Sequence, residues 1–217
     1  MSITLRQVYN AAAGSVSGVA VQPNDLILVM FYGYNAGNDD DPPSDGSNTY
    51  TKVRYYSTTV DGGAPVRLGM YWAKAVGAAT LTVNVPASFS SHPKIIVHVY
   101  YGQDLTAPVD SSMTFKDAGA TTNHVTGNLT LAATGMMVAL WAHAGVTSVD
   151  TGADSWTLQV NQTSEGFFAV DSLDKVYAAP GDYTASMTST VTKIYAAIFA
   201  GFKGALVGNT GNMFMVL

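Results

Sequence analysis

The sequence predicts an all-β protein, folded as a jelly-roll-like antiparallel β-sandwich built from two similar four-stranded halves. Nearly every apolar run is short, rich in β-branched or aromatic residues, and bounded by Gly, Pro, Asn, Asp or Ser, which is the pattern of strands. No segment has the periodicity of an amphipathic helix. The two halves of the chain also resemble each other in four blocks that keep their order.

The expected strands follow one another with short polar connections. The run Lys94–Gly102 is apolar on both faces, so we expect a central strand that is covered on each side. Residues 110–122 fit either one turn of helix or an extended crossing. In chain order the strands are predicted at 2–9, 15–21, Leu26–Gly33, Thr49–Val60, Val66–Ala75, Ala79–Val85, Lys94–Gly102, Gly127–Ala133, Met136–Gly145, Ser155–Gln162, Gly166–Ala178, Asp182–Thr188 and Lys193–Lys203.

The run Thr49–Val60 mixes charged and aromatic side chains. Strict alternation along a strand would place Tyr50, Lys52, Arg54 and Tyr56 on one face. Because two of these four side chains are charged, we expect that face to contact water.

The repeat indicates how the chain is divided. Either half alone would leave an apolar face bare, so we expect both halves to share one core within a single domain, 1–203. This domain comprises an N-terminal strand pair (1–21), a first half (22–103), a crossing (104–126) and a second half (127–203), followed by a C-terminal apolar arm (204–217). The four matches pair Tyr50 with Trp156, Leu81 with Tyr183, Lys94 with Lys193 and Gly102 with Gly201.

Composition limits the classes of function. Charged residues make up 12% of the chain, about half of the usual ~25%. The net charge of −5 argues against a nucleic-acid partner, which would favour a basic protein. No stretch approaches the ~18 apolar residues of a membrane span, and the first residues lack the pattern of a signal peptide. We therefore expect a protein made in the cytoplasm, with no membrane partner, and a surface partly covered by other protein.

The arm ends in five apolar residues, Met213, Phe214, Met215, Val216 and Leu217. Soluble proteins seldom leave such a patch uncovered. The arm is therefore expected to fold back on its own sheet or to dock on a neighbouring subunit, and these five residues are the predicted interface.

The most polar stretch, Tyr34–Val53, contains the candidate metal ligands. Calcium accepts six to eight oxygen ligands, which Asn38, Asp39, Asp41 and Asp45 would supply in part. The spacing does not match a helical calcium loop, and the corresponding loop of the second half lacks the aspartates. A solvated turn stiffened by two prolines remains the alternative, and no cofactor is expected.

Catalytic motifs are absent from the sequence. There is no G-x-S-x-G elbow, no phosphate-binding glycine loop and no H-E-x-x-H pattern. Glu165 is the single glutamate, so a glycosidase pair would need two aspartates that nothing singles out. The four histidines, including His98 within an apolar strand, are expected to be structural. We expect a protein that is not an enzyme.

The segments NDLILVMFYGY, SDGSNTYTKV, LGMYWAKAVGAATLTVNV and KIIVHVYYG, with AAPGDYTASMT and YAAIFAGFK near the end, resemble a recurrent β-sandwich domain of tailed-bacteriophage virion proteins and some bacterial surface proteins. The similarity covers about Val21–Lys203. Asn24 replaces the first glycine of that pattern, and an acidic Pro-Pro insertion precedes the turn.

This resemblance implies a function in assembly or attachment. It implies a virion location, a homotrimer, and capsid or other virion proteins as partners, with no catalytic residues to transfer. The expected function is capsid decoration, in which a cement protein stabilises the assembled head. The alternative is a carbohydrate-binding or host-attachment module with a glycan ligand, and a glycoside-active enzyme is a third, weaker hypothesis.

Overall fold

The protein is built from antiparallel β-strands, which confirms the expected all-β class. The computed structural model describes residues 3–34, 41–60, 63–89, 92–144, 150–152, 155–164 and 168–205. Within these ranges the one helical element is a 3₁₀ turn, η2 (Ala87–Phe89), and none forms a helix that would span a lipid bilayer. The strands are β1 (Thr4–Ala11), β2 (Ser15–Val21), β3 (Leu26–Tyr34), β4 (Thr51–Val60), β5 (Ala64–Lys74), β6 (Ala79–Asn84), β7 (Lys94–Tyr101), β8 (Val109–Lys116), β9 (Thr121–Val125), β10 (Leu129–Leu131), β11 (Gly135–Ala144), β12 (Asp150–Gly152), β13 (Thr157–Ser164), β14 (Phe168–Tyr177), β15 (Gly181–Tyr183), β16 (Ser186–Lys193) and β17 (Ala196–Lys203).

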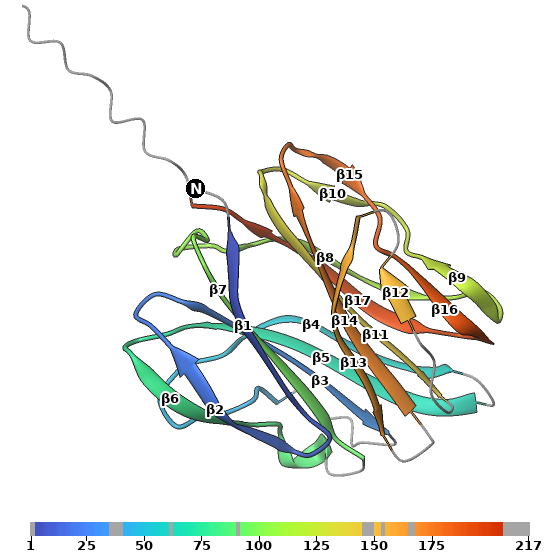
Figure 1. The fold of residues 1–217 in the computed structure, drawn as a ribbon, viewed down its shortest axis with the longest axis horizontal. Coiled ribbons are helices and arrows are strands. Elements are labelled where there is room, and N and C mark those ends of the chain that lie inside the picture. Colours follow the sequence, from blue (N-terminus) through green and yellow to red (C-terminus); the bar gives the residue numbers. More distant parts are fainter. Residues whose placement is uncertain are drawn as a thin grey trace, which may run out of the picture.

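Two five-stranded sheets face each other at the centre of the molecule (Figure 1). The first sheet has the order β1-β7-β3-β5-β4, and the second has the order β8-β17-β11-β14-β13. The strand pair β2–β6 covers the outer face of the first sheet. The small sheets β10–β15 and β12-β16-β9 lie over the outer face of the second sheet. The sandwich therefore has four layers.

The second half of the chain repeats the first strand by strand. Replacing β1, β7, β3, β5 and β4 by β8, β17, β11, β14 and β13 converts the order of the first main sheet into that of the second. The outer pair is repeated as well, with β2 corresponding to β9 and β10, and β6 corresponding to β15 and β16. Each main sheet has five strands where four were predicted, because the segments assigned to the strand pair and the crossing supply the edge strands β1 and β8.

Strand pairing shows which of the predicted matches are correct. Val19 pairs with Leu81 in the first half as Leu129 pairs with Tyr183 in the second, so the match of Leu81 with Tyr183 is confirmed. The match of Tyr50 with Trp156 is supported too, because each packs into the outer core of its own half.

The match of Lys94 with Lys193 is wrong. Lys94 begins β7 in the first main sheet, whereas Lys193 ends β16 in an outer sheet. The residues that occupy the same place are Ile96 and Ile198, which pair with the centres of β3 and β11. The predicted match of Gly102 with Gly201 is shifted from the Ile96–Ile198 correspondence by an odd number of residues. Such a shift exchanges the two faces of a strand, so this match is wrong as well.

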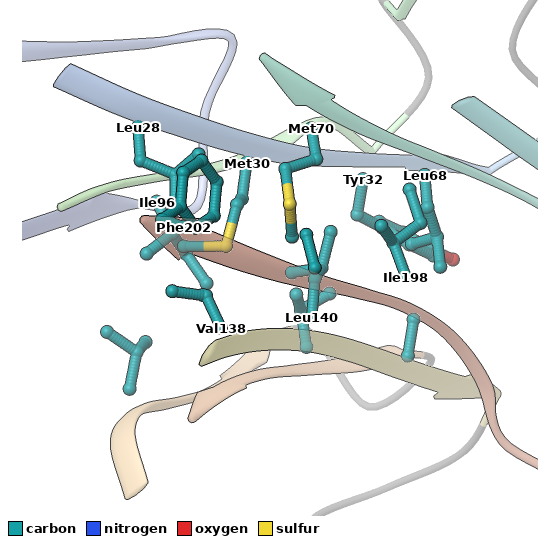
Figure 2. Packing of buried hydrophobic residues seen from close by; sticks show 14 of the residues in the cluster. Leu28, Met30, Tyr32, Leu68, Met70, Ile96, Val138, Leu140, Ile198 and Phe202 are labelled. Carbon is teal, nitrogen blue, oxygen red and sulfur yellow. The ribbon is translucent and has the colours of Figure 1, made fainter. Parts of the chain in front are cut away.

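Three apolar clusters fill the molecule where the sequence predicted a single core. The central core lies between the two main sheets, and each half has an outer core beneath its own small strands. Figure 2 shows the central core, in which side chains of both main sheets interdigitate. The number of cores differs from the prediction because the small strands bury the outer faces of the main sheets. Those outer faces are the ones that the sequence predicted to contact water or other proteins. The labelled central-core residues are Leu28, Met30, Tyr32, Leu68, Met70, Ile96, Val138, Leu140, Ile198 and Phe202.

All four edge strands of the main sheets carry a β-bulge. The ladder shifts between Leu5 and Gln7 in β1, and between Lys52 and Arg54 in β4. Their repeats β8 and β13 shift at the equivalent places. Bulges on edge strands twist the unpaired backbone and hinder pairing with other chains.

The bulge in β4 also overturns the predicted face of that strand. Tyr50 packs into the outer core, whereas Tyr56 packs against the central core on the opposite face. Because the bulge at Val53 adds one residue, the period of two is broken between these tyrosines. Lys52 and Arg54 are exposed, as predicted.

Candidate functional site

Two seams run beside the central core, where the edges of the main sheets meet. In the closed seam, β4 and β8 are joined by two hydrogen bonds. Arg54 Nη2 donates to the Ser112 carbonyl at 3.2 Å, and Ser112 Oγ donates to the Val53 carbonyl at 3.3 Å. In the open seam, β1 approaches β13, and a pocket of about 350 Å³ lies between the sheets.

The pocket of the open seam is apolar with one polar end. Its polar end is formed by Asp174 of β14 and Gln159 of β13, and Thr4 adds a hydroxyl. Asp174 is nearly buried, whereas Val176 at the mouth is 59% exposed. The apolar lining consists of Ile3, Leu5, Met136 and Val176.

A hydrogen-bond chain runs from the pocket into the central core. Gln159 Nε2 donates to Asp174 Oδ1 at 2.8 Å, and the Tyr100 hydroxyl donates to Asp174 Oδ2 at 3.2 Å. His98 Nδ1 lies 2.6 Å from the Tyr100 oxygen, and His98 Nε2 lies 3.0 Å from Ser172 Oγ. The chain therefore joins β7 of one main sheet to β13 and β14 of the other.

The order of donors along this chain determines the tautomer of His98. An ionised Asp174 only accepts, so the Tyr100 hydroxyl donates to it and its oxygen accepts a proton from His98 Nδ1. His98 Nε2 then carries no proton and accepts from the Ser172 hydroxyl. Every polar atom of the imidazole is thereby satisfied with the ring neutral, so His98 is structural, as the sequence suggested.

Burial acts on both titratable ends of the chain. Burial lowers the pKa of His98 to about 3, so the ring is uncharged at neutral pH. Burial also raises the pKa of the Asp174 carboxyl, although hydrogen bonds from Gln159 and Tyr100 oppose that rise. Both hydrogen-bond partners of Asp174 are neutral, so no ion pair within the described part of the chain balances its negative charge.

The contact of Ser172 with His98 has the geometry of a nucleophile and its base. However, Ser172 and His98 are fully buried, and the pocket meets the chain at Asp174. A substrate entering the pocket would reach the carboxylate and not the serine hydroxyl. The arrangement is suited to holding the two sheets together and to presenting a carboxylate to a ligand.

The repeat supplies an internal comparison, because the closed seam has the same strands without the polar chain. Asp174 pairs with Val138 and Thr157, and Trp72 holds the same place in the first sheet, pairing with Leu28 and Thr51. By the same correspondence, the residues equivalent to His98, Tyr100, Ser172 and Gln159 in the other repeat are Ala200, Phe202, Met70 and Val53, in that order. A seam without this buried polar chain is therefore compatible with the architecture.

The predicted calcium ligands are only partly described. Asp45 Oδ1 accepts from the Ser47 and Asn48 backbone amides, and Oδ2 accepts from Asn48 Nδ2 and the Tyr50 hydroxyl, all at 2.8 Å. Burial on its own raises the pKa of the Asp45 carboxyl, but these hydrogen bonds outweigh it and lower the pKa. Asp45 thus closes a turn. Asp41 is exposed, and Asp39 and Asn38 lie outside the described residues.

The remaining predicted residues fall elsewhere. The interface residues Met213, Phe214, Met215, Val216 and Leu217 lie outside the described residues. Within the described part of the chain, no group of three or more His, Asp or Glu side chains is placed to hold a metal ion. His124 Nδ1 lies 2.6 Å from Asp117 Oδ2 in the outer core of the second half, where both are buried.

Sequence reasoning did not single out the polar chain, because its members are far apart in the sequence. His98 and Ser172 are 74 residues apart. A partial signal was nevertheless present, since His98 interrupts an apolar strand.

Comparisons of this chain with protein family models, curated proteins and solved structures found no match. The likeness to phage virion domains therefore depends on the sequence segments quoted above. The architecture supported by the structure is an antiparallel β-sandwich with two main five-stranded sheets.

Proposed function

We propose that this chain is a non-enzymatic virion structural protein, most specifically a capsid decoration protein that stabilises the assembled head. The observation that carries the proposal is a gathering of exposed apolar side chains at one end of the molecule. Four of the five most exposed large apolar residues among the described ones lie where β3 and β11 begin. This apolar end consists of Val76 (76% exposed), Tyr101 (43%), Leu105 (45%) and Val176 (59%).

The apolar end is also where the chain leaves the described structure. The Ala205 amide donates to the Gly102 carbonyl at 2.7 Å, beside the loop that carries Leu105. Residues 213–217 follow within a short length of chain. A surface with exposed apolar side chains favours burial against other protein subunits.

Each half also supports a jelly-roll-like arrangement. In the first half β1 pairs with β7, β2 with β6, and β3 with β5, so the strand pairs are nested along the chain. Nested antiparallel pairs are what a rolled-up hairpin produces. We propose that each half is a jelly-roll-like wrap, and that the chain is a fused pair of such wraps.

The experiment compares assembly of three proteins: wild type, a variant lacking 213–217, and Leu105→Asp in the apolar end. Mass is measured by light scattering, and capsid retention is measured by co-sedimentation with assembled phage capsids. The proposal expects oligomers and capsid retention in wild type and weaker retention in both variants. Thr122→Asp, at an exposed position of β9, is the control. Wild-type retention in both variants, or a monomer that ignores capsids, would contradict the proposal.

A carbohydrate-binding or host-attachment module is the second candidate. Tyr101 is partly exposed, and the Arg6 guanidinium lies over its ring at 4.9 Å from the centroid. Exposed aromatic rings beside charged groups are typical of sugar contacts. A glycan array, run with and without chelator, tests this candidate directly, and a lack of glycan binding removes it.

A further inference from the structure

We propose that the pocket of the open seam binds the cationic side chain of a partner protein, a lysine or arginine whose apolar stem lies against Ile3, Leu5, Met136 and Val176 and whose charge meets Asp174. Three independent features of the seam point to this ligand chemistry: a preformed acceptor, an apolar channel leading to it, and the contrast with the closed seam.

The acceptor is a carboxylate that is held in place and has no countercharge among the residues that the structure describes. Gln159 and Tyr100 fix its two oxygens, and Tyr100 is itself held by His98. Both direct partners are neutral, and each carboxylate oxygen has a second lone pair to offer. A cation that enters the pocket forms a charge-assisted hydrogen bond there without displacing either neighbour.

The shape of the pocket selects a side chain with an apolar stem. Its volume of about 350 Å³ lies at the small end of the range for ligand sites. Ile3 and Leu5 line it from β1, and Val176 lines it from the opposite sheet. Long basic side chains bury an apolar stem while their charged end finds a polar partner.

The closed seam shows that the fold does not need this pocket. At the place of Asp174 it carries Trp72, which packs against the central core, and Val53 takes the place of Gln159. Because Trp72 and Val53 occupy these two places in the closed seam, the buried carboxylate and amide of the open seam are a local departure. Such departures from apolar packing are concentrated at functional sites.

The test uses two small probes on the intact protein. Nα-acetyl-lysine methylamide carries the cation and stem, and Nα-acetyl-norleucine methylamide has a similar stem without the charge. Methyl NMR signals of Ile3, Leu5, Met136 and Val176 are followed during each titration at neutral pH and low salt. The lysine probe is expected to shift these signals saturably in the millimolar range, about tenfold more tightly than the norleucine probe. Equal binding of both probes, or no shift of these methyls, overturns the proposal.

Two variants localise the charge. Asp174→Asn keeps the size of the side chain and is expected to reduce binding of the lysine probe to the level of the norleucine probe. Asp182→Asn, at an exposed aspartate of β15, is expected to leave the affinity unchanged. Undiminished binding by Asp174→Asn overturns the proposal. If Asp174→Asn fails to fold, the comparison of the two probes on the wild-type protein still decides.

The preference of the pocket for a cation is separate from the virion role. Probe binding is measured on the isolated protein, so its failure leaves capsid binding through the apolar end untouched. Conversely, a protein that ignores capsids can still bind the lysine probe through Asp174.

Discussion

His98 and Asp174 lie in one hydrogen-bond chain, and burial favours the uncharged form of each. The pKa of His98 in the folded protein is about 3, below the usual value of 6.5. As the pH falls, the unfolded chain therefore protonates at a higher pH than the folded protein does. The pKa of the Asp174 carboxyl is raised in the folded protein. As the pH falls, the folded protein therefore protonates this group at a higher pH than the unfolded chain does. The two residues therefore give stability opposite dependences on pH.

The contribution of His98 is fully present above pH 6.5 and is lost as the pH falls toward 3. The loss approaches about 1.4 kcal/mol per pH unit, or about 5 kcal/mol over the interval. We expect His98→Gln to reduce this slope between pH 6 and 4, although it is less stable than wild type at pH 7. Urea unfolding at several pH values measures the slope. His92→Asn, at an exposed histidine, should keep the wild-type slope, and an equally steep His98→Gln would contradict the assignment.

The contribution of Asp174 to stability changes with pH in the opposite direction. It is greatest below the ordinary pKa of an aspartate and declines as the pH rises. Asp174→Asn removes that decline, and rotation of the Gln159 amide restores both hydrogen bonds. We expect Asp174→Asn to lie within about 1 kcal/mol of wild type at pH 7. Asp174→Ala should cost about 2–3 kcal/mol, because the Tyr100 hydroxyl and the Gln159 amide lose their acceptor. Chemical denaturation of both variants measures the difference, and equal stabilities would show that the chain does not pin the seam.

At the scale of elements, most strands could be predicted because the local composition of the sequence indicates a strand. The run Lys94–Gly102 is such a case: β7 is buried on both faces between β1 and β3, as expected. The sequence does not decide between a helical turn and an extended segment for the edge strand β8. Its sequence, VDSSMTFK, is mixed in polarity, and its residues are half-buried except for the exposed Lys116. A half-covered edge has no strong pattern, so position in the sheet and not composition decides its structure.

The bulges and the pocket could not be predicted, because they depend on register between strands that are distant in the chain. Gln159 reaches Asp174 because β13 shifts against β14 between Leu158 and Val160. Without that shift the period of two would assign the side chains beyond it to the opposite face. The sequence showed a histidine within an apolar strand, but it did not show that His98 meets Asp174.

The glycine in β5 shows how one residue determines the packing of neighbouring strands. A Cβ added at Gly69 would lie 2.4 Å from ring atoms of Phe31, which itself contacts Tyr71 and Phe89. We expect Gly69→Ala to destabilise the fold by about 1–3 kcal/mol, since Phe31 must leave its place over the strand. Gly77→Ala is the control, because its Cβ meets nothing within 4 Å. Thermal unfolding of both variants tests this, and similar midpoints would show that Phe31 adapts freely.

At the scale of the whole molecule, the central core joins two repeats that each have an outer core. Because residues of both main sheets contribute to it, separation of the halves would expose the apolar faces seen in Figure 2. Each outer core is closed by its own small strands. The question is therefore whether the shared core is large enough to make the two halves unfold together.

Leu140→Ala tests this coupling, because Leu140 of the second half is fully buried in the central core. We expect a loss of about 2–5 kcal/mol and one unfolding midpoint for the whole chain. In a Trp72→Phe background, tryptophan fluorescence monitors the second half through Trp141 and Trp156. Hydrogen exchange of the β3 and β7 amides monitors the first half. Val125→Ala, at an exposed position of β9, should change stability by less than about 0.5 kcal/mol. If β3 and β7 keep their protection after the fluorescence change is complete, the halves unfold separately, and the central core is an interface between two independent sandwiches.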